Sequence, residues 1–480
     1  MTHPGSSCRD MPAIITDSRH QKLLLGAVAL GILMDGIDGS IVNVALPTIA
    51  TAFDTDAGTI SWVIITYLLM MAGLILVFGN LADRGIMKRV FVGGLFLFTV
   101  GSAACGFAPD LSVLLAARIV QGIGAAMIAA AASLLCVRYL PPQMLGAALG
   151  VLAASSSIGF AAGPALGGII THFLSWHWIF LINIPIGIIG IVLAVRVIPK
   201  DVPDLEKKPY DLPGAAMLFG AMVFGVFALE EVSALSVTDP RIITCAILCA
   251  LFTLLFIVRE LRTAAPFIDL AMFRKWQFSF VLTAFLLINV VYAGVLYLLP
   301  FYLTAAMKFS LIISGIFLLI PPVVTGLISI QFGRWSDTYG PRWFTVAACV
   351  ALILFGAIFA VMVPESGVLP LIVGLVLMGL VFGIAGGAGA SRIIENAPPG
   401  EEGTGSSLMI TTIYFGGVLG TALYATVLTS ATAVGGVVAF ADLDPAVFLD
   451  GFHFTILVGL ILSVIPLVLS AMVNDKKKPA

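Results

Sequence analysis

Apolar stretches recur along the whole chain, and each is about as long as the ~20-residue helix that spans the hydrocarbon core of a bilayer. Fourteen can be counted in the 480 residues, at roughly 23–47, 59–79, 90–108, 111–136, 144–170, 178–198, 212–232, 241–261, 277–303, 312–332, 343–363, 369–391, 405–430 and 452–473. Charged residues make up 10% of the chain, whereas soluble domains are about 25% charged. The sequence therefore predicts an all-α integral membrane protein.

Basic residues indicate which side of the membrane each connection faces, because cytoplasmic loops carry an excess of lysine and arginine. With fourteen spans and a cytoplasmic start, 21 of the 24 basic residues fall in inner segments, and only Arg241 and Lys308 fall in outer loops. A missed or extra span would exchange the sides of everything after it and destroy this asymmetry. We therefore expect both termini to be cytoplasmic. The net charge of −2 gives no reason to expect nucleic acid as a partner.

One short motif occurs twice. Gly79 to Asp83 follows the second span and Gly333 to Asp337 follows the tenth, both in short inner loops of the form G-x-x-x-D. The two motifs take equivalent places if spans 7 and 8 are an insert and the other twelve form two six-helix bundles, the parallel repeat of many transporters. A carboxylate in such a loop can cap a helix of the other bundle, so Asp83 is expected to latch the inner side.

This repeat predicts the domain organisation of the chain. It divides into a cytoplasmic segment 1–22, an N-terminal bundle 23–198, a linker with two inserted transmembrane helices 199–276, a C-terminal bundle 277–473 and a cytoplasmic tail 474–480. The long basic inner segment at 200–211 marks the start of the insert.

The first span carries two aspartates, Asp35 and Asp38. A carboxylate in hydrocarbon costs several kcal/mol unless it is neutralised, paired or hydrated. Three residues apart, the two side chains share one face of a helix, which belongs in the protein interior or along a water-filled path. Solvation at the outer boundary is the alternative, but Asp35 lies roughly 18 Å from the start of the helix, too deep for it. We expect both aspartates to take part in proton coupling.

The fourth span contains Arg118, an arginine that needs a partner inside a bilayer. Arg118 lies roughly 10 Å below the outer end of its helix and Asp38 roughly 13 Å below the end of its own. These matching depths predict a direct or water-bridged pair whose release couples a proton to helix movement. A purely structural ion pair is the alternative. Gln121 shares the face of Arg118 and is a candidate for the substrate cavity.

The fifth span combines close-packing glycines with a proline. Gly159, Gly163 and Gly167 are spaced by four on one face, as in small-xxx-small helix contacts, and Gly168 follows. Pro164 removes a backbone hydrogen bond and bends the helix. The pattern predicts a helix-packing seam that controls the direction in which a cavity opens. The alternative is a kinked packing seam that serves only the structure.

Three further residues are weaker candidates for a substrate cavity. Asn289 and Tyr292 share a face of the ninth span, where they could line a cavity or hydrogen-bond between helices. The pair Glu230-Glu231 ends the seventh span, about 27 Å from its inner end. A solvated outer boundary is the favoured interpretation of Glu230, with a cavity role as the alternative.

The sequence gives no sign of enzymatic chemistry. It holds no phosphate-binding glycine loop, no catalytic triad and no cluster with metal-ligand spacing, and its six cysteines are scattered, five of them in or beside apolar spans. We expect no cofactor, no metal and no enzyme activity.

Four stretches together resemble the fourteen-helix drug:proton antiporters of the major facilitator superfamily. The stretch 37–47 (IDGSIVNVALP) is similar to the first-helix signature LDxTIVNVALP, and 114–126 to the fourth-helix motif with its proton-linked arginine, here Arg118. The stretch 159–168, followed by SWHWIFLINIPIG at 175–187, is similar to the antiporter motif, and 79–89 to the inner-loop motif GxLxDRxGRK. In that loop Asp83, Arg84 and Lys88 fit the pattern, whereas Ile86 stands at its second glycine and Gly85 comes one residue early.

The resemblance implies a major facilitator fold and a proton-coupled multidrug exporter that works by alternating access. The proton gradient would supply the energy, and the substrates would be lipophilic, cationic small molecules bound between the bundles. An antiporter or facilitator of a neutral or anionic metabolite is the alternative, and a receptor or scaffold that transports nothing is a remote one. We expect a monomer in the plasma membrane of a prokaryote.

The topology can be tested with reporter fusions at Lys207 and Asp442. The charge distribution places Lys207 in an inner segment and Asp442 in an outer loop. A cytoplasm-active reporter should be active at Lys207 and inactive at Asp442, and an export-dependent reporter should show the reverse. Fusions that report the same side for both positions would contradict the count of fourteen spans.

Overall fold

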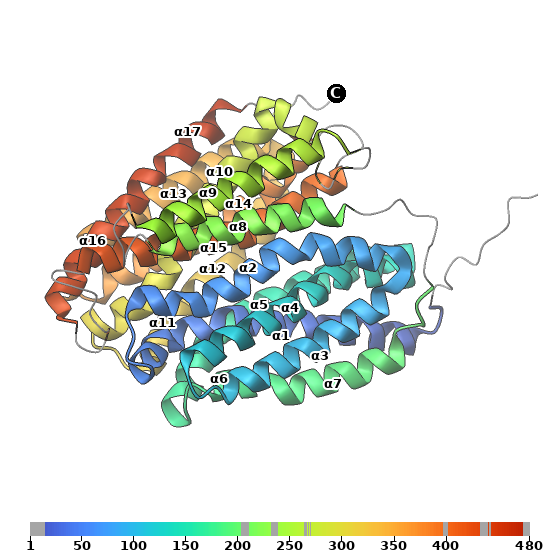
Figure 1. Ribbon diagram of the computed structural model, residues 1–480, viewed down its shortest axis with the longest axis horizontal. Coiled ribbons are helices and arrows are strands. Elements are labelled where there is room, and N and C mark those ends of the chain that lie inside the picture. Colours follow the sequence, from blue (N-terminus) through green and yellow to red (C-terminus); the bar gives the residue numbers. More distant parts are fainter. Residues whose placement is uncertain are drawn as a thin grey trace, which may run out of the picture.

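The computed structural model is helical throughout its described part, which comprises residues 15–202, 211–231, 239–263, 266, 268, 270–396, 402–432, 440 and 443–473. In Figure 1 the helices of the first half, in blue to green, lie beside those of the second half, in yellow to red. Both halves are bundles of long helices that run roughly parallel or antiparallel to one another.

The N-terminal bundle contains α1 (Ser18–Ala52), α2 (Ala57–Leu81), α3 (Met87–Gly106), α4 (Leu111–Tyr139), α5 (Leu145–Phe173), the short α6 (Trp178–Leu181) and α7 (Asn183–Val197). Three of these helices have an aspartate as N-cap: Asp17 caps α1, Asp56 caps α2 and Asp110 caps α4. Such caps satisfy amide groups that the first turn of a helix leaves unpaired.

The C-terminal bundle contains α10 (Trp276–Phe301), α11 (Leu311–Leu318), α12 (Ile320–Tyr339), α13 (Pro341–Val361), α14 (Val368–Asn396), α15 (Glu402–Thr432), α16 (Pro445–Leu462) and α17 (Val464–Met472). Two predicted spans are each interrupted beside a proline, one between α11 and α12 near Pro321 and the other between α16 and α17 near Pro466. Proline lacks an amide hydrogen and displaces the preceding turn, so interruptions are expected there.

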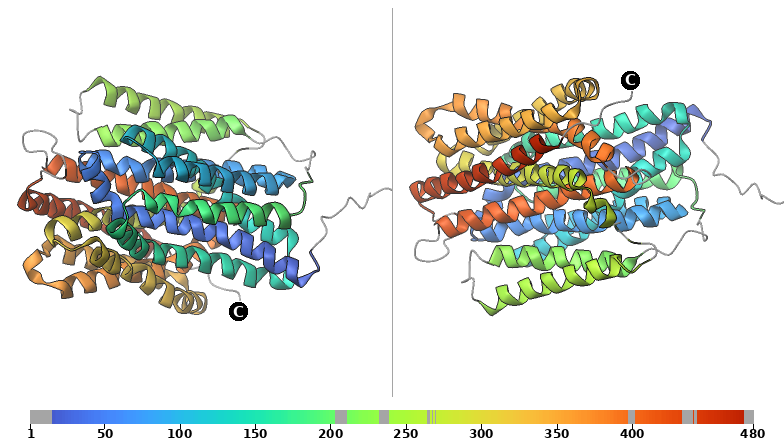
Figure 2. Two further views of the ribbon diagram at one scale, coloured as in Figure 1. Left: turned by 90° about the horizontal axis from the view of Figure 1, so that it is seen from below. Right: turned by 90° about the horizontal axis from the view of Figure 1, so that it is seen from above.

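The inserted helices α8 (Leu212–Glu231) and α9 (Pro240–Glu260) form an antiparallel pair along the side of the two bundles (Figure 2). At one end of the pair, Asp211 accepts a hydrogen bond from the backbone of Gly214 and pairs with Arg259, whose Nε lies 2.7 Å from its Oδ1. Helix α8 packs against α2 of one bundle and α15 of the other, and Phe256 of α9 joins an apolar cluster with Phe278 of α10. The insert therefore lies on the line where the bundles meet.

Thirteen stretches of the described chain are long and apolar enough to cross a membrane. The longest, Ala57–Gly106, holds both α2 and α3, which are separated where Gly85 adopts a positive φ of 87°. That backbone conformation is open to glycine and strained for other residues. The count of fourteen spans treats α2 and α3 as separate crossings; it and the cytoplasmic termini stay predictions.

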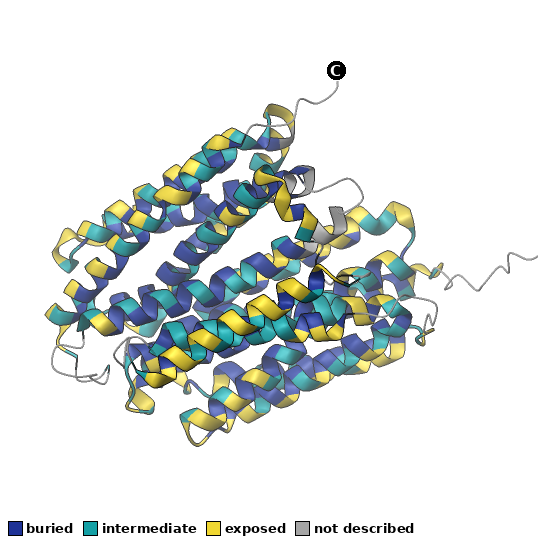
Figure 3. Ribbon diagram, turned by 45° about the horizontal axis from the view of Figure 1, so that its top comes forward, coloured by how far each residue is buried: buried dark blue, intermediate teal, exposed yellow. Residues whose placement is uncertain are grey.

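Side-chain burial follows the pattern of a protein surrounded by lipid. In Figure 3 buried faces turn toward the centre of the bundles and exposed faces turn outward. The exposed faces carry large apolar residues, as on α9, where Ile247 is 60% and Leu254 59% exposed. A soluble protein rarely exposes so continuous an apolar surface, so these faces are suited to contact with lipid tails.

The bundles share one apolar core at the end of the molecule where α1 meets α2. The charge distribution predicts this end to be the outer one, and we call it the outer end. There a single cluster includes Ile60 of α2, Leu299 of α10 and Leu428 of α15. Toward the other end, one cluster around Phe91 belongs mainly to the N-terminal bundle and another around Phe278 to the C-terminal bundle and its neighbours. Buried apolar packing thus joins the bundles mainly at the outer end.

Close backbone contact between α5 and α11 adds to this closure. A Cβ atom built on Gly168 would lie 2.4 Å from the carbonyl oxygen of Leu311, and one built on Gly315 would lie 2.4 Å from that of Pro164. Side chains larger than hydrogen would push the two backbones apart, so these glycines allow the bundles to touch.

Substitution of Gly168 tests this contact. Alanine favours a helix over glycine by about 1 kcal/mol, but overpacking a close contact costs about 1–3 kcal/mol. Gly168→Ala should therefore lower the thermal unfolding temperature of the purified protein in detergent. Gly146→Ala on the same helix is the matched control, because nothing lies within 4 Å of its added Cβ, and it should leave that temperature unchanged or raise it. Equal behaviour of the two variants would contradict the packing argument.

Candidate functional site

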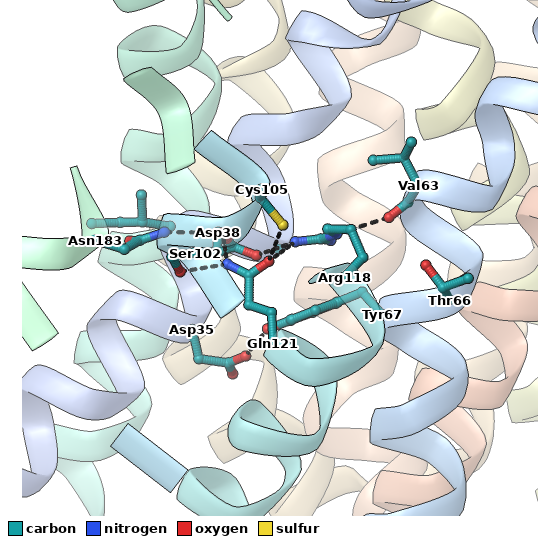
Figure 4. A network of polar contacts seen from close by, with 12 residues as sticks. Asp35, Asp38, Val63, Thr66, Tyr67, Ser102, Cys105, Arg118, Gln121 and Asn183 are labelled. Carbon is teal, nitrogen blue, oxygen red and sulfur yellow. Dashed lines mark hydrogen bonds and ion pairs between the residues drawn. The ribbon is translucent and has the colours of Figure 1, made fainter. Parts of the chain in front are cut away.

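Two aspartates lie near the middle of α1 and face the interior of the protein (Figure 4). Asp38 is fully buried and Asp35 is 8% exposed. Neither lies at a solvated membrane boundary, because α1 continues for more than three turns beyond Asp38 to Ala52. Both carboxyl groups must therefore be stabilised by protein groups or by the contents of a cavity.

The structure places Asp38 and Arg118 in direct contact. Nη1 of Arg118 donates to Oδ2 of Asp38 over 2.6 Å. Oδ1 of Asp38 accepts two further hydrogen bonds, from Nε2 of Gln121 at 2.7 Å and from Nδ2 of Asn183 at 3.0 Å. Helices α4 and α7 thus supply three donors to one carboxylate of α1. Charge-assisted hydrogen bonds of this kind are the strong ones in proteins, so the charged form of Asp38 is well satisfied here.

Arg118 is held by groups from other helices as well. Its Nε donates to the backbone oxygen of Val63 in α2 over 2.9 Å, and its guanidinium carbon lies 4.2 Å from the ring centre of Tyr67. Gln121 accepts from Arg118 through Oε1 and donates through Nε2 to Ser102 of α3. The pair is therefore the centre of a network that joins α1, α2, α3, α4 and α7.

Asp35 has a separate partner on α2. The hydroxyl of Tyr67 donates to Oδ1 of Asp35 over 2.5 Å, while the ring of the same tyrosine stacks against Arg118. Tyr67 thereby connects the two acidic positions, as Figure 4 shows. The sequence analysis missed Tyr67. A hydroxyl-bearing aromatic residue in the middle of an apolar span was the signal that could have singled it out.

Asp35 lines a cavity between the two bundles. The cavity has a volume of about 320 Å³, which is in the usual range for small-molecule sites. Both bundles contribute to its lining, which consists of Asp35, Gly39, Asn43, Ile64, Tyr67, Leu68, Ser156, Ser157, Phe160, Asn289, Tyr292, Ala293, Leu296, Pro322, Thr325, Phe382, Ile413, Tyr414, Gly417 and Thr421. Five of these residues are aromatic, and Asp35 is the one charged residue among them.

Two of the four weak cavity candidates lie in the lining and two do not. Asn289 and Tyr292 line the cavity. Gln121 does not, because its amide is taken up by Asp38, Arg118 and Ser102 in the buried network.

Glu230 is the other candidate outside the cavity, and its favoured interpretation as a solvated boundary residue is wrong. Its side chain is buried, with 5% of the residue exposed. The reason is that α8 packs on α2 and α15, whose hydroxyl groups reach the carboxyl: Ser61 donates to it over 2.9 Å. Length along the span could not reveal this contact.

The glycines of α5 meet two different partners. Gly159, Gly163 and Gly167 pack against α1 of the same bundle: a Cβ on Gly159 would lie 2.6 Å from the oxygen of Leu33, and one on Gly167 2.7 Å from that of Ile41. Gly168 and Pro164 instead meet α11 of the other bundle. Close approach thus fixes α1 against α5, and the neighbouring positions carry the contact between bundles.

The repeated inner motif lies at helix ends rather than in short loops. Gly79 to Asp83 forms the end of α2 and the start of a π-helical turn, Ala82–Ile86, and Gly333 lies within α12. Asp83 is exposed, and Arg84 donates to Asn80 over 3.3 Å. The side chain of Asp337 lies outside the described part of the chain. A gating role for these residues stays a prediction.

Lys88 contacts its own bundle. Its Nζ donates to the backbone oxygens of Val195 and Ile198 over 2.7 and 2.6 Å, at the end of α7. A cation at a helix C-terminus is stabilised by the unpaired carbonyls there. Asp201 completes the connection, since it accepts from the backbone amides of Lys88 and Arg89 at the start of α3.

Among the described residues, no group of three or more His, Cys, Asp and Glu side chains could hold a metal ion.

Comparisons with known proteins bear on the family and the fold of the chain. The profile described as Major Facilitator Superfamily matches residues 28–421. The riboflavin transporter RibZ of Clostridioides difficile (strain 630) is 31% identical over 402 residues, which are 84% of this chain and 87% of that protein. The drug efflux pump JefA of Mycobacterium tuberculosis (strain CDC 1551 / Oshkosh) is 30% identical over 417 residues, 85% of this chain and 81% of that protein. Among solved structures, the peptide transporter POT in complex with sulfate aligns over 93% of this chain and 94% of its own, with a TM-score of 0.68 at 15% identity.

A double-mutant cycle tests how much the buried pair contributes to the structure. Removing one partner of a buried ion pair leaves an uncompensated charge and costs about 3–5 kcal/mol, whereas replacing both by neutral groups is often nearly neutral. Arg118→Gln should therefore lower the thermal unfolding temperature strongly, and Asp38→Asn combined with Arg118→Gln should restore much of the loss.

Arg89→Gln is the matched control, because the side chain of Arg89 is 77% exposed and lies 3.7 Å from Asp201. The guanidinium of Arg89 stays largely in solvent, and the buried carboxylate of Asp201 keeps two backbone amide donors without it. A solvent-screened pair contributes about 1 kcal/mol or less, so this variant should unfold close to the wild-type temperature. A double variant as unstable as Arg118→Gln alone would show that the Asp38 charge is not what the arginine compensates.

Proposed function

The chain belongs to the major facilitator superfamily, and on that basis we propose that it is a proton-coupled exporter of lipophilic small molecules. The observation that carries the proposal is the connection through Tyr67, which joins a carboxyl group in the cavity to a buried ion pair. A cavity carboxyl can bind either a cationic substrate or a proton. A second carboxylate paired with arginine can change its proton affinity when the helices that hold the arginine move. Exchange of substrate for proton requires both a binding carboxyl in the cavity and a carboxylate whose proton affinity changes with conformation.

Alternating access would use the contact between the bundles at the outer end. With that end packed together, the cavity can exchange substrate only toward the inner side. Separation of α2 from α15 and of α5 from α11 would expose it to the outside instead. Asp38 would take up a proton from outside as substrate leaves, and the gradient would drive the return. Fourteen spans, cytoplasmic termini, a monomeric state and a prokaryotic plasma membrane are parts of the same proposal.

The lining of the cavity favours lipophilic cations as substrates. Asp35 gives the site a negative charge, and rings such as Tyr67, Phe160 and Phe382 offer faces that attract a cation. The similarity to the drug efflux pump JefA supports export of this kind.

Transport of a metabolite is the second candidate. The relative named as a riboflavin transporter favours it, and the aromatic lining also suits a flat neutral ring system. The two candidates differ in their dependence on charge: a cation needs the carboxylate of Asp35, whereas a neutral ligand depends mainly on the rings. Cells with and without the protein, exposed in parallel to ethidium and to riboflavin, would distinguish export of the two.

Substrate-induced proton release from purified protein tests the coupling. Ethidium added to weakly buffered wild-type protein should release protons, measured with a pH dye at several pH values. Asp38→Asn cannot exchange a proton at that position, so release should fall. Asp35→Asn should weaken ethidium binding by roughly tenfold, which corresponds to about 1.4 kcal/mol of lost charge attraction, with little effect on an uncharged ligand.

Asp110→Asn is the control, because Asp110 is an exposed N-cap of α4 outside the network, and its proton release should match the wild type. Full proton release from Asp38→Asn would exclude Asp38 as the coupling site. Undiminished ethidium binding by Asp35→Asn would favour the metabolite over the cation.

A further inference from the structure

The inserted helix α8 brings a carboxyl group to the seam between the bundles. Glu230 lies next to the last residue of α8, and 5% of it is exposed. The exporter proposed above places its proton chemistry on α1 and α4 and gives Glu230 no part in it. A carboxyl buried at membrane depth is costly, so its position and contacts call for an explanation.

The carboxyl of Glu230 lies within hydrogen-bonding distance of hydroxyl groups from both bundles. Oγ of Ser61 in α2 donates to Oε1 over 2.9 Å. Oγ1 of Thr426 in α15 donates to the backbone oxygen of Leu229 over 3.1 Å and lies 3.4 Å from Oε2 of Glu230. One turn of the inserted helix thus bridges α2 of the N-terminal bundle and α15 of the C-terminal bundle.

Two further polar contacts between the bundles lie at the start of α2 and just before it. The hydroxyl of Tyr297 in α10 donates to the backbone oxygen of Ala57, and the amide of Phe440 donates to that of Thr55 over 3.1 Å. A Cβ built on Gly58 would lie 3.5 Å from Cβ of Thr429 in α15. Glu230 therefore lies at the closed seam, where any opening must separate its two hydroxyl partners.

The titratable groups around Glu230 come from three elements. Two of them are acidic and interact electrostatically with Glu230: Asp56, the N-cap of α2, and Glu231, the next residue of α8. The third is Tyr297 of α10, which also interacts electrostatically with Glu230. Burial disfavours a negative charge on Glu230 in the closed seam, the hydroxyl donors Ser61 and Thr426 oppose this effect, and the two acidic neighbours add to it. Hydration of the carboxyl in an opened seam would favour that charge.

We propose that Glu230 is a proton-operated latch of the outer seam, through which the inserted helix pair controls opening. Its carboxyl takes up a proton from the outer solution as α2 and α15 close on α8, and returns the proton to the same side as they separate. Because this proton enters and leaves on one side, it adds nothing to the number of protons carried per substrate. The latch makes opening depend on external pH, while coupling stays with α1 and α4. The proposal rests on the alternating access proposed above.

A disulfide across the seam reports closure without any substrate. Cysteines at Gly58 and Thr429 would have Cβ atoms about 3.5 Å apart, which is suitable for a disulfide. The full-length protein, with its native cysteines replaced, is reconstituted in vesicles, and the rate of copper-phenanthroline cross-linking is measured from pH 5 to pH 9. Each rate is divided by that of the same cysteine pair carrying Glu230→Gln, so that the pH dependence of thiol chemistry cancels.

This ratio of rates should fall as the pH rises, by up to about tenfold per pH unit where one proton is linked to closure. Asp110→Asn is the control, because Asp110 is an exposed N-cap of α4 outside the seam, and it should keep the wild-type dependence. Glu230→Asp keeps a titratable group and should restore a pH dependence, which a merely structural role would not do. A ratio that stays constant with pH, or no difference between Glu230→Asp and Glu230→Gln, would overturn the proposal.

The outcomes separate the latch from the exporter. A constant ratio refutes the latch and leaves proton-coupled export untouched. Failure of wild-type vesicles to move ethidium under a pH gradient, with a pH-dependent ratio intact, would refute ethidium export and leave the latch standing. Glu230→Gln should also keep the wild-type number of protons exchanged per ethidium, and a changed number would assign Glu230 to coupling instead.

Discussion

The ion pair between Arg118 and Asp38 determines where four helices of the N-terminal bundle can lie. A buried charge in a membrane protein must be paired and its remaining hydrogen-bonding groups satisfied, because each unpaired group costs several kcal/mol. Here α2 supplies a backbone oxygen, and α4 and α7 supply amide groups. The pair is therefore both a structural centre and a place where a change in protonation would be felt by every helix around it. In the proposed exporter, stability and coupling would depend on the same bonds.

Small residues set the distances on which this centre depends. Gly159, Gly163 and Gly167 let α1 lie against α5 within backbone contact, which keeps Asp35 and Asp38 at a fixed depth. Gly168 and Gly315 do the same between the bundles at the outer end. Rigid contact within a bundle and a narrow contact between bundles are what a rocking movement requires, since each half can move as a unit around the line where they touch.

Sequence reasoning predicted the parts of this structure that depend on local pattern. Apolar length gave the helices, and the depths of Asp38 and Arg118 in their spans anticipated that the two would meet. Tyr67, Asn183 and the position of Glu230 were not predictable in this way, because each acquires its role from a helix distant in the sequence. The same limit applies to Lys88, which fitted the inner-loop motif and whose partners are carbonyl groups at the end of α7. A motif gives residue types, and tertiary packing decides which neighbours they find.

Three of the buried carboxyl groups, Asp35, Asp38 and Glu230, differ in what surrounds them, and in the proposed exporter this difference would suit them to different tasks. Asp38 is bound by an arginine and two amides, so a proton can reach it only if those donors withdraw. Asp35 faces the cavity with a single tyrosine donor, so substrate and proton compete for it directly. Glu230 lies between hydroxyl groups of the two bundles, so it responds to whether they touch. A carrier of the proposed kind must distinguish an empty, a loaded and a closed state, and these three carboxyl groups would each be sensitive to one of them.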